Sequence, residues 1–262
     1  MYPKIIAFIL LLILNASLTA QLNDTINKVD MNGKKQGHWI KKYPDGHVQY
    51  EGYFKDDNPT GTFRRYFDND TLMSVMVFSN EGKTADATIF HPNGHIASKG
   101  MFVNQRKEGK WSFYSSEIEG YLICEEEYRD NMKDGTSFKY FPGKITAEKL
   151  TWSNDVRNGD WFQYYPNGNT FLKATYADGK LQGEFKVFFS NGKLQYAGQY
   201  KDDSRDGLWN IYNPDGSLKY KVEYESGRAK NSDLDKQESD YLDSLEKNKG
   251  KFSDPEKTGT VW

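Results

Sequence analysis

The chain has 262 residues, of which 37 are acidic and 35 basic, so its formal net charge is −2 with the four histidines neutral. That balance provides no general attraction for nucleic acid or for an anionic membrane surface, and we expect neither as an electrostatic partner. One cysteine permits no internal disulfide, while aromatic residues make up 15% of the chain. This composition favours a protein stabilised by aromatic side chains on sheet surfaces.

The first twenty residues have the pattern of a secretory signal peptide. Lys4 precedes ten apolar residues, Ile5 to Leu14, and the small residue Ala20 follows a short polar stretch. Ten apolar residues are about half of the ~20 needed to span a bilayer, which disfavours a permanent anchor. We predict cleavage after Ala20 and a secreted or periplasmic protein; an uncleaved anchor is the main alternative.

A marker glycine returns about every 24 residues from residue 37 to residue 207. An aromatic residue stands seven positions before each later marker. The markers are Gly37, Gly61, Ala85 in place of a glycine, Gly109, Gly135, Gly159, Gly183 and Gly207. A fixed period of this length indicates a quasi-one-dimensional array of one small unit.

Each unit reads as a β-hairpin. In the last unit, apolar and polar residues alternate from Leu218 to Tyr224, which is the period of a strand with one buried face. The preceding turn, Asn213-Pro214-Asp215-Gly216, has the residues of a type I turn closed by a glycine bulge. The second connection, as in residues 176–183, reads as a polar loop. Eight such units predict about sixteen strands.

These patterns predict an all-β fold: an elongated single-layer antiparallel array of about eight 24-residue hairpins over residues 21–230. Because no helix is expected there to cover a face, the sheet must curl so that its aromatic stripe packs on itself. Residues 231–247 favour a short amphipathic helix, since Leu234, Tyr241, Leu242 and Leu245 share one helical face. This helix covers the last hairpin or reaches for a partner. Residues 248–262 are expected to be disordered.

The repeated pattern resembles MORN repeats, and more closely their bacterial variant. It is clearest in the ten residues that begin at Gly159 and at Gly183. The resemblance covers roughly residues 27–230 and implies a curved single-layer sheet of hairpins. It also implies a role in protein scaffolding, dimerisation or lipid contact, and some bacterial variants carry the label of YwqK-like antitoxins. Departures fall at Ala85-Asp86-Ala87, in a longer turn over residues 115–120, and in a shorter turn at Phe141.

Two sets of residues are candidates for partner binding. Tandem aromatics must place one ring on the outward face, where it can hold a peptide, an acyl chain or a sugar. Acidic residues near the long turn form the second set, for which a solvated charge row or a calcium contact are the alternatives. The candidates are Tyr164, Tyr165, Phe188, Phe189, Glu117, Glu119, Glu125 and Glu127.

Other chemistry-bearing residues have simpler interpretations. His91 and His95 flank a turn without cysteines or carboxylates at ligand spacing, so we expect solvated histidines, no metal and no cofactor. Cys124 occupies an inward strand position and is expected to be a small buried hydrophobe. No recognisable catalytic motif is present, so an enzyme is not expected.

The favoured function is a non-catalytic exported binding or scaffold module for a protein or a cell-envelope polymer. An antitoxin or immunity-type inhibitor is the alternative that the resemblance implies, although export makes a cytoplasmic toxin an awkward target. A lipid-associated scaffold is the second alternative, with peripheral membrane contact that the net charge does not support. A hydrolase that uses Glu125 and Glu127 is the remaining hypothesis.

Overall fold

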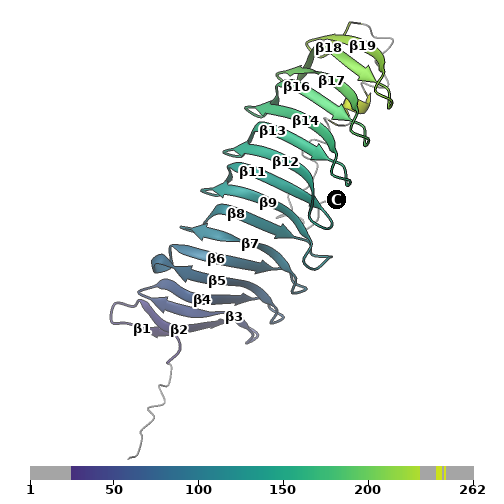
Figure 1. Cartoon of the computed structure of the whole chain (residues 1–262). Coiled ribbons are helices and arrows are strands. Elements are labelled where there is room, and N and C mark those ends of the chain that lie inside the picture. The colour runs from purple at the N-terminus through teal and green to yellow at the C-terminus, as the bar shows by residue number, and fades with distance from the viewer. Residues whose placement is uncertain (1–24, 231–239, 244, 246–262) are drawn as a thin grey trace, which may run out of the picture.

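The computed structural model describes residues 25–230, 240–243 and 245, and its strands form one open antiparallel sheet of twenty strands. Figure 1 shows a long single layer in which strands follow one another in chain order. Sixteen of the twenty strands have six or more residues and four have two. The predicted array of about sixteen hairpin strands is therefore confirmed. The predicted signal peptide (1–20) and disordered tail (248–262) lie outside the described residues.

The strand bounds follow the 24-residue rhythm. In the first half they are β1 (Lys28–Val29), β2 (Lys35–Lys42), β3 (Val48–Lys55), β4 (Asn58–Tyr66), β5 (Leu72–Ser79), β6 (Thr84–Phe90), β7 (Ile96–Val103), β8 (Arg106–Tyr114), β9 (Leu122–Arg129) and β10 (Met132–Lys133). In the second half they are β11 (Gly135–Phe141), β12 (Ile145–Ser153), β13 (Val156–Tyr164), β14 (Thr170–Ala177), β15 (Lys180–Leu181), β16 (Gly183–Phe188), β17 (Leu194–Lys201), β18 (Ser204–Tyr212), β19 (Leu218–Glu225) and β20 (Arg228–Ala229). A 3-10 turn, η1 (Asn80–Gly82), joins β5 to β6.

Two kinds of turn alternate along the array. In the first hairpin Gly46 has a φ of 99° and its N–H donates to the Tyr43 carbonyl at 3.0 Å, as a type I turn with a glycine bulge requires. The second connections are tighter than the predicted polar loops. Asp56 and Asp57 both have positive φ, at 51° and 69°, and this arrangement matches the twist of the strands it joins.

The marker glycines form the bulges that interrupt strand pairing. Each of them has positive φ, for example 61° at Gly61 and 69° at Gly207, which a side chain rarely tolerates. The pairing of β3 with β4 shifts register beside Gly61. By contrast, β5 and β6 pair from Ser74↔Ile89 to Ser79↔Thr84 without a shift. Ala85 replaces the marker glycine because this one junction has no bulge.

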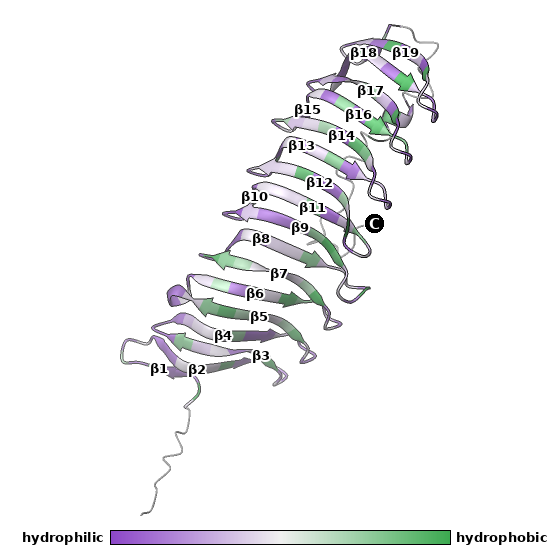
Figure 2. Ribbon diagram, viewed as in Figure 1, coloured by the Kyte–Doolittle hydropathy of each residue, from purple (hydrophilic) through white to green (hydrophobic). Residues whose placement is uncertain are grey.

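The core lies on one face of the sheet, here called the inward face, which carries Trp111, Trp161 and Trp209. Hydrophilic and hydrophobic residues interleave along the strands (Figure 2), because successive side chains point to opposite faces of the sheet. Ring-to-ring contacts run along the inward face; Trp209 meets Phe185, Tyr200 and Tyr224 at centroid distances of 5.4 to 5.9 Å. The aromatic stripe packs laterally on itself, as the sequence predicted.

The described part of the tail packs against the inward face. Residues 240–243 and 245 are helical. The Tyr241 ring stacks on Tyr196 of β17 at 5.6 Å, and Leu242, only 2% exposed, joins the core cluster of β12–β19. Asp243 forms an ion pair with Arg205 of β18 at 2.5 Å. The other residues of the predicted helix, 231–239, 244, 246 and 247, lie outside the described residues.

Candidate binding surfaces

An aromatic column runs along the outward face, opposite the core. Its residues stand five positions after each marker from the second unit onward: Tyr66, Phe90, Tyr114, Tyr140, Tyr164, Phe188 and Tyr212. Tyr164 stacks on Phe162 at 6.3 Å and an interplanar angle of 17°. The Nζ atoms of Lys149 and Lys173 lie 5.9 and 6.0 Å from the Phe162 centroid. Six of the seven rings are half-buried and Tyr140 is buried.

Two of the predicted binding residues, Tyr164 and Phe188, belong to this column. Tyr165 has a different role, because its hydroxyl donates to the Phe188 carbonyl of the next hairpin at 2.8 Å. The equivalent Tyr43 donates to the Tyr66 carbonyl at 2.9 Å. Phe189 occupies the equivalent turn position in its unit and is half-buried. Tyr165 thus fastens adjacent hairpins together.

The acidic candidates are dispersed. Glu117 and Glu119 are exposed in the long turn before β9. Glu125 is not a solvated charge, since its side chain is 15% exposed, accepts a hydrogen bond from Tyr140 Oη at 2.7 Å and pairs with Lys110. Burial alone raises the pKa of Glu125, but the Tyr140 hydroxyl and the Lys110 ammonium together lower it. Glu127 is exposed and accepts the Thr136 N–H at 3.0 Å.

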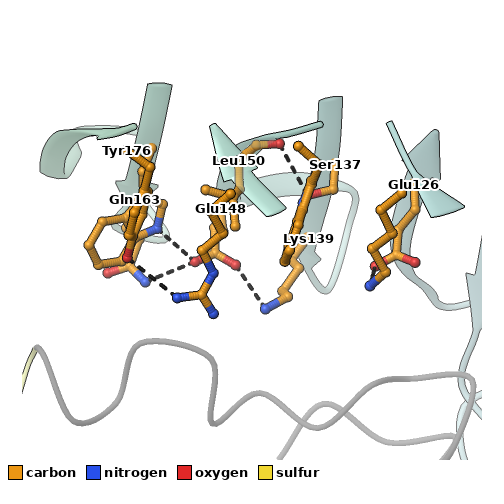
Figure 3. Close-up of polar contacts among 11 residues, drawn as sticks. Glu126, Ser137, Lys139, Glu148, Leu150, Gln163 and Tyr176 are labelled. Carbon is orange, nitrogen blue, oxygen red and sulfur yellow. Dashed lines mark hydrogen bonds and ion pairs between the residues drawn. The ribbon is translucent and has the colours of Figure 1, made fainter. Parts of the chain in front are cut away.

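A buried polar network lies on the inward face, where sequence reasoning placed none (Figure 3). Glu148 of β12 is 8% exposed and pairs with Lys139 Nζ of β11 at 2.8 Å. Its other oxygen accepts the Trp161 indole N–H at 2.9 Å and the Gln163 amide at 3.2 Å. Burial raises the pKa of Glu148, yet the Lys139 charge and these hydrogen bonds outweigh it and lower the pKa.

A second buried carboxylate lies one hairpin away. Glu126 is 5% exposed and receives hydrogen bonds from Lys133 Nζ and Tyr128 Oη, both at 2.6 Å. Ser137 stands where most units carry a Trp or Phe, and its hydroxyl accepts the Trp152 indole N–H at 2.8 Å. These polar groups lie between two apolar clusters, one centred on β8 and β9 and the other on β12–β19.

Cations cover the inward aromatic rings. Lys107 Nζ lies 5.0 Å from the Trp111 centroid, and the Arg157 guanidinium lies 5.4 Å from Tyr176. Desolvation by burial raises the pKa of Tyr176 to about 12. In the sequence, these inward cations correspond to a basic residue two positions before the marker glycine, as at Lys35, Lys107, Lys133, Arg157 and Arg205. Alternation alone does not show which of these basic side chains lie over rings, so the sequence pattern does not by itself predict the arrangement.

An apolar cavity of about 240 Å³ opens on the inward face at the departure around Ala85. It is lined by Met76, Phe78, Ala85 and Phe102, with Lys83 and Gln105 at its polar side. In a regular unit the ring lies directly over a glycine of the preceding strand. The Trp111 ring, for example, is so close to Gly100 that a Cβ added there would stand 2.3 Å from it. Ala87 stands in the ring position of this unit and Met76 is its cross-strand partner. The cavity is therefore the space that a missing ring leaves.

The remaining candidates hold structural contacts. A ring nitrogen of His91 lies 3.2 Å from the Tyr114 carbonyl and one of His95 lies 3.2 Å from the Ser116 carbonyl, so both histidines join neighbouring hairpins. Cys124 is 1% exposed, as predicted. Among the described residues there is no group of three or more His, Cys, Asp or Glu side chains placed to hold a metal ion. None of the described helical residues forms a segment long and apolar enough to cross a bilayer.

Together the fold and these surfaces define an elongated β-hairpin repeat protein whose residues 25–230 form a single-layer sheet. A family model described as "MORN repeat variant" matches residues 35–56, 83–104, 157–178, 181–202 and 205–226. The chain belongs to the MORN repeat variant family, as the repeated pattern indicated. Proteins built from these repeats act as binding and scaffold modules and are generally not enzymes. The buried network of Glu126 and Glu148 lies in the interval between the second and third matched segments.

Comparison with solved structures gives only remote likenesses. The crystal structure of TcdB2-TccC3-Cdc42 is 14% identical over 72% of this chain with a TM-score of 0.23. That of TcdB2-TccC3 is 12% identical over 77% of the chain with a TM-score of 0.21. This chain spans 11% and 12% of the length of those two chains, and neither likeness carries a functional argument. No curated protein matches the sequence.

Proposed function

We propose that this protein is an exported, non-catalytic scaffold that binds an extended cell-envelope polymer along its outward face. The observation that supports this proposal is the outward aromatic column, which recurs in seven consecutive units. Because adjacent strands lie ~4.8 Å apart, one ring per hairpin gives a spacing of roughly 9.6 Å along the sheet. A linear polymer with a repeat of similar length meets an equivalent ring in each hairpin.

The chemistry of the column favours a glycan chain over a charged polymer. Half-buried rings present flat apolar surfaces, while neighbouring lysines can donate hydrogen bonds and neighbouring carboxylates can accept them. Lys110 is paired with Glu125, and Lys186 with Glu184 at 2.5 Å, so carboxylates accompany these two outward cations. Aromatic surface with mixed polar groups suits the alternating C–H and hydroxyl faces of sugars.

Export to the envelope is part of the proposal and rests on the signal-peptide pattern of residues 1–20. Expression of the full chain with a C-terminal tag, followed by fractionation and mass determination, tests it. A mass that corresponds to a chain beginning at Gln21 in the secreted or periplasmic fraction is the expected result. An unprocessed chain confined to the cytoplasm would refute export.

Co-sedimentation with insoluble envelope polysaccharide tests polymer binding. The full chain is compared with a variant that carries both Tyr164→Ser and Phe188→Ser, and with Lys201→Gln as a matched outward-face control. We expect at least a tenfold loss of affinity in the double variant and none in the control. Equal binding by all three proteins, or binding by none of them, would contradict the proposal.

A further inference from the structure

The described tail shows what kind of segment the inward face accepts. Within one helical turn it presents an aromatic ring to Tyr196, a leucine to the core and the carboxylate of Asp243 to Arg205. Arg205 itself lies over Trp209 and Tyr224, at 5.9 and 5.4 Å from their centroids. An acidic amphipathic helix therefore fits a face built from aromatic rings and the cations above them.

The same chemistry continues along the face to the amino-terminal half. Lys35 Nζ lies 4.9 Å from Trp39 and 4.8 Å from Phe54, and the inward rings of β2–β7 are half-buried. Around Trp209, by contrast, the rings are almost fully buried, and Trp209 itself has 0% exposure. The stretch from β2 to β7 is thus the more accessible part of the inward face.

The cavity beside Ala85 gives this half a specific anchor point. Its volume of about 240 Å³ exceeds the roughly 150 Å³ cavity in which benzene binds, so one large apolar side chain fits. Lys83 stands at its polar side, and its ion pair with Glu81 is long, at 4.0 Å, between two side chains exposed by 62% and 84%. An apolar cavity beside an exposed ammonium group is complementary to a helix that carries a leucine or an aromatic side chain next to a carboxylate.

We propose that the cavity between β5, β6 and β7 binds an acidic amphipathic helix of a partner protein. The helix inserts one apolar side chain beside Met76 and pairs a carboxylate with Lys83. This surface is on the face opposite the outward aromatic column, so polymer binding and helix binding are separable. The protein then joins a polymer on one face to a protein on the other.

The probe for the test is a fluorescent peptide with the sequence of residues 232–247, which contains six carboxylates and two lysines as well as Tyr241 and Leu242. Its anisotropy is measured during titration with the full chain. We expect saturable binding that weakens at high salt, because the Lys83 pair is exposed. A peptide with serine at the positions of Tyr241 and Leu242 is the control and is expected not to bind.

Two variants locate the binding site. Met76→Gly combined with Ala87→Phe restores the ring-over-glycine arrangement and fills the cavity, and Lys83→Glu reverses the charge without touching the core. Each is expected to weaken peptide binding at least tenfold while the thermal midpoint stays within a few degrees of the parent. Tyr164→Ser with Phe188→Ser, on the outward face, is expected to leave peptide binding unchanged.

Several outcomes would overturn the proposal. A flat titration, or unchanged affinity in the Lys83→Glu variant, would do so. A loss of peptide binding in Arg205→Gln but not in Lys83→Glu would do so as well, because it would show that the peptide only exchanges with the chain's own tail. Concentration-dependent dimerisation of the full chain, abolished by Lys83→Glu, would assign the cavity to a second copy instead of a partner. Failure of the polymer assay alone leaves the helix proposal standing, because the two faces are distinct.

Discussion

Neutralising Glu148 tests whether the inward polar network stabilises the fold. In Glu148→Gln the side chain keeps its shape, but Lys139 loses its counter-charge. Breaking a fully buried ion pair costs ~3–5 kcal/mol. Because the side chains of Lys139 and Glu148 are 21% and 11% exposed, we expect a smaller loss of about 2–3 kcal/mol. For a chain of this size the melting temperature falls by roughly 2–4 °C per kcal/mol.

The double variant Lys139→Gln/Glu148→Gln separates charge from packing. Since both charges are then absent, we expect it to recover most of the loss. Urea unfolding followed by tryptophan fluorescence, together with thermal melts, measures the stability of each protein. Glu127→Gln is the matched control, because Glu127 is exposed, and its effect should stay within about 0.5 kcal/mol.

The same pair predicts a pH dependence of stability. The folded-state pKa of Glu148 lies below its ordinary value of 4.5, so the carboxylate contributes its full stabilisation above that value. The contribution is lost as the pH falls through the lower folded-state pKa. The difference between the parent and Glu148→Gln should therefore be constant near neutrality and shrink below pH 4.5. A variant as stable as the parent at pH 7, or a difference that does not shrink in acid, would refute this reasoning.

Four further substitutions test the repeat geometry by urea unfolding. Gly100→Ala should cost ~1–3 kcal/mol, because its Cβ would stand 2.3 Å from the Trp111 ring; no loss would mean that the ring does not pack there. Gly207→Ala should cost ~1–2 kcal/mol at a φ of 69°, whereas Ala85→Gly should cost only ~0.5–1 kcal/mol; the reverse order would contradict the bulge assignment. Tyr165→Phe should lose ~1 kcal/mol with its inter-hairpin hydrogen bond, and an unchanged midpoint would show that this bond is not stabilising.

Most of the fold could be predicted from the 24-residue repeat period. Strand alternation depends on the two-residue side-chain period, and the Pro-Asp-Gly turns depend on local φ preferences. Both can be recognised directly in the sequence. They predicted the hairpins, the single-layer array and the buried position of Cys124. They required one ring of each tandem pair to face outward but did not say which one; in the folded sheet Tyr164 and Phe188 take the outward position.

Tertiary structure decided what the local pattern could not express. Glu126 and Glu148 read as ordinary strand carboxylates, and their burial became visible only when Lys133 and Lys139 were placed beside them by pairing between strands. The cavity beside Ala85 likewise depends on which side chain lies over which neighbouring strand.

The sequence by itself determined the hairpin unit, its repetition and its turns, because these depend on residues that are close along the chain. Only the folded sheet decided which charges are buried, which rings stack and where one ring is missing. Those properties arise between residues about 7 to 40 positions apart, from the pair of Lys133 with Glu126 to that of Arg205 with Asp243, and the alternation along one strand does not encode them.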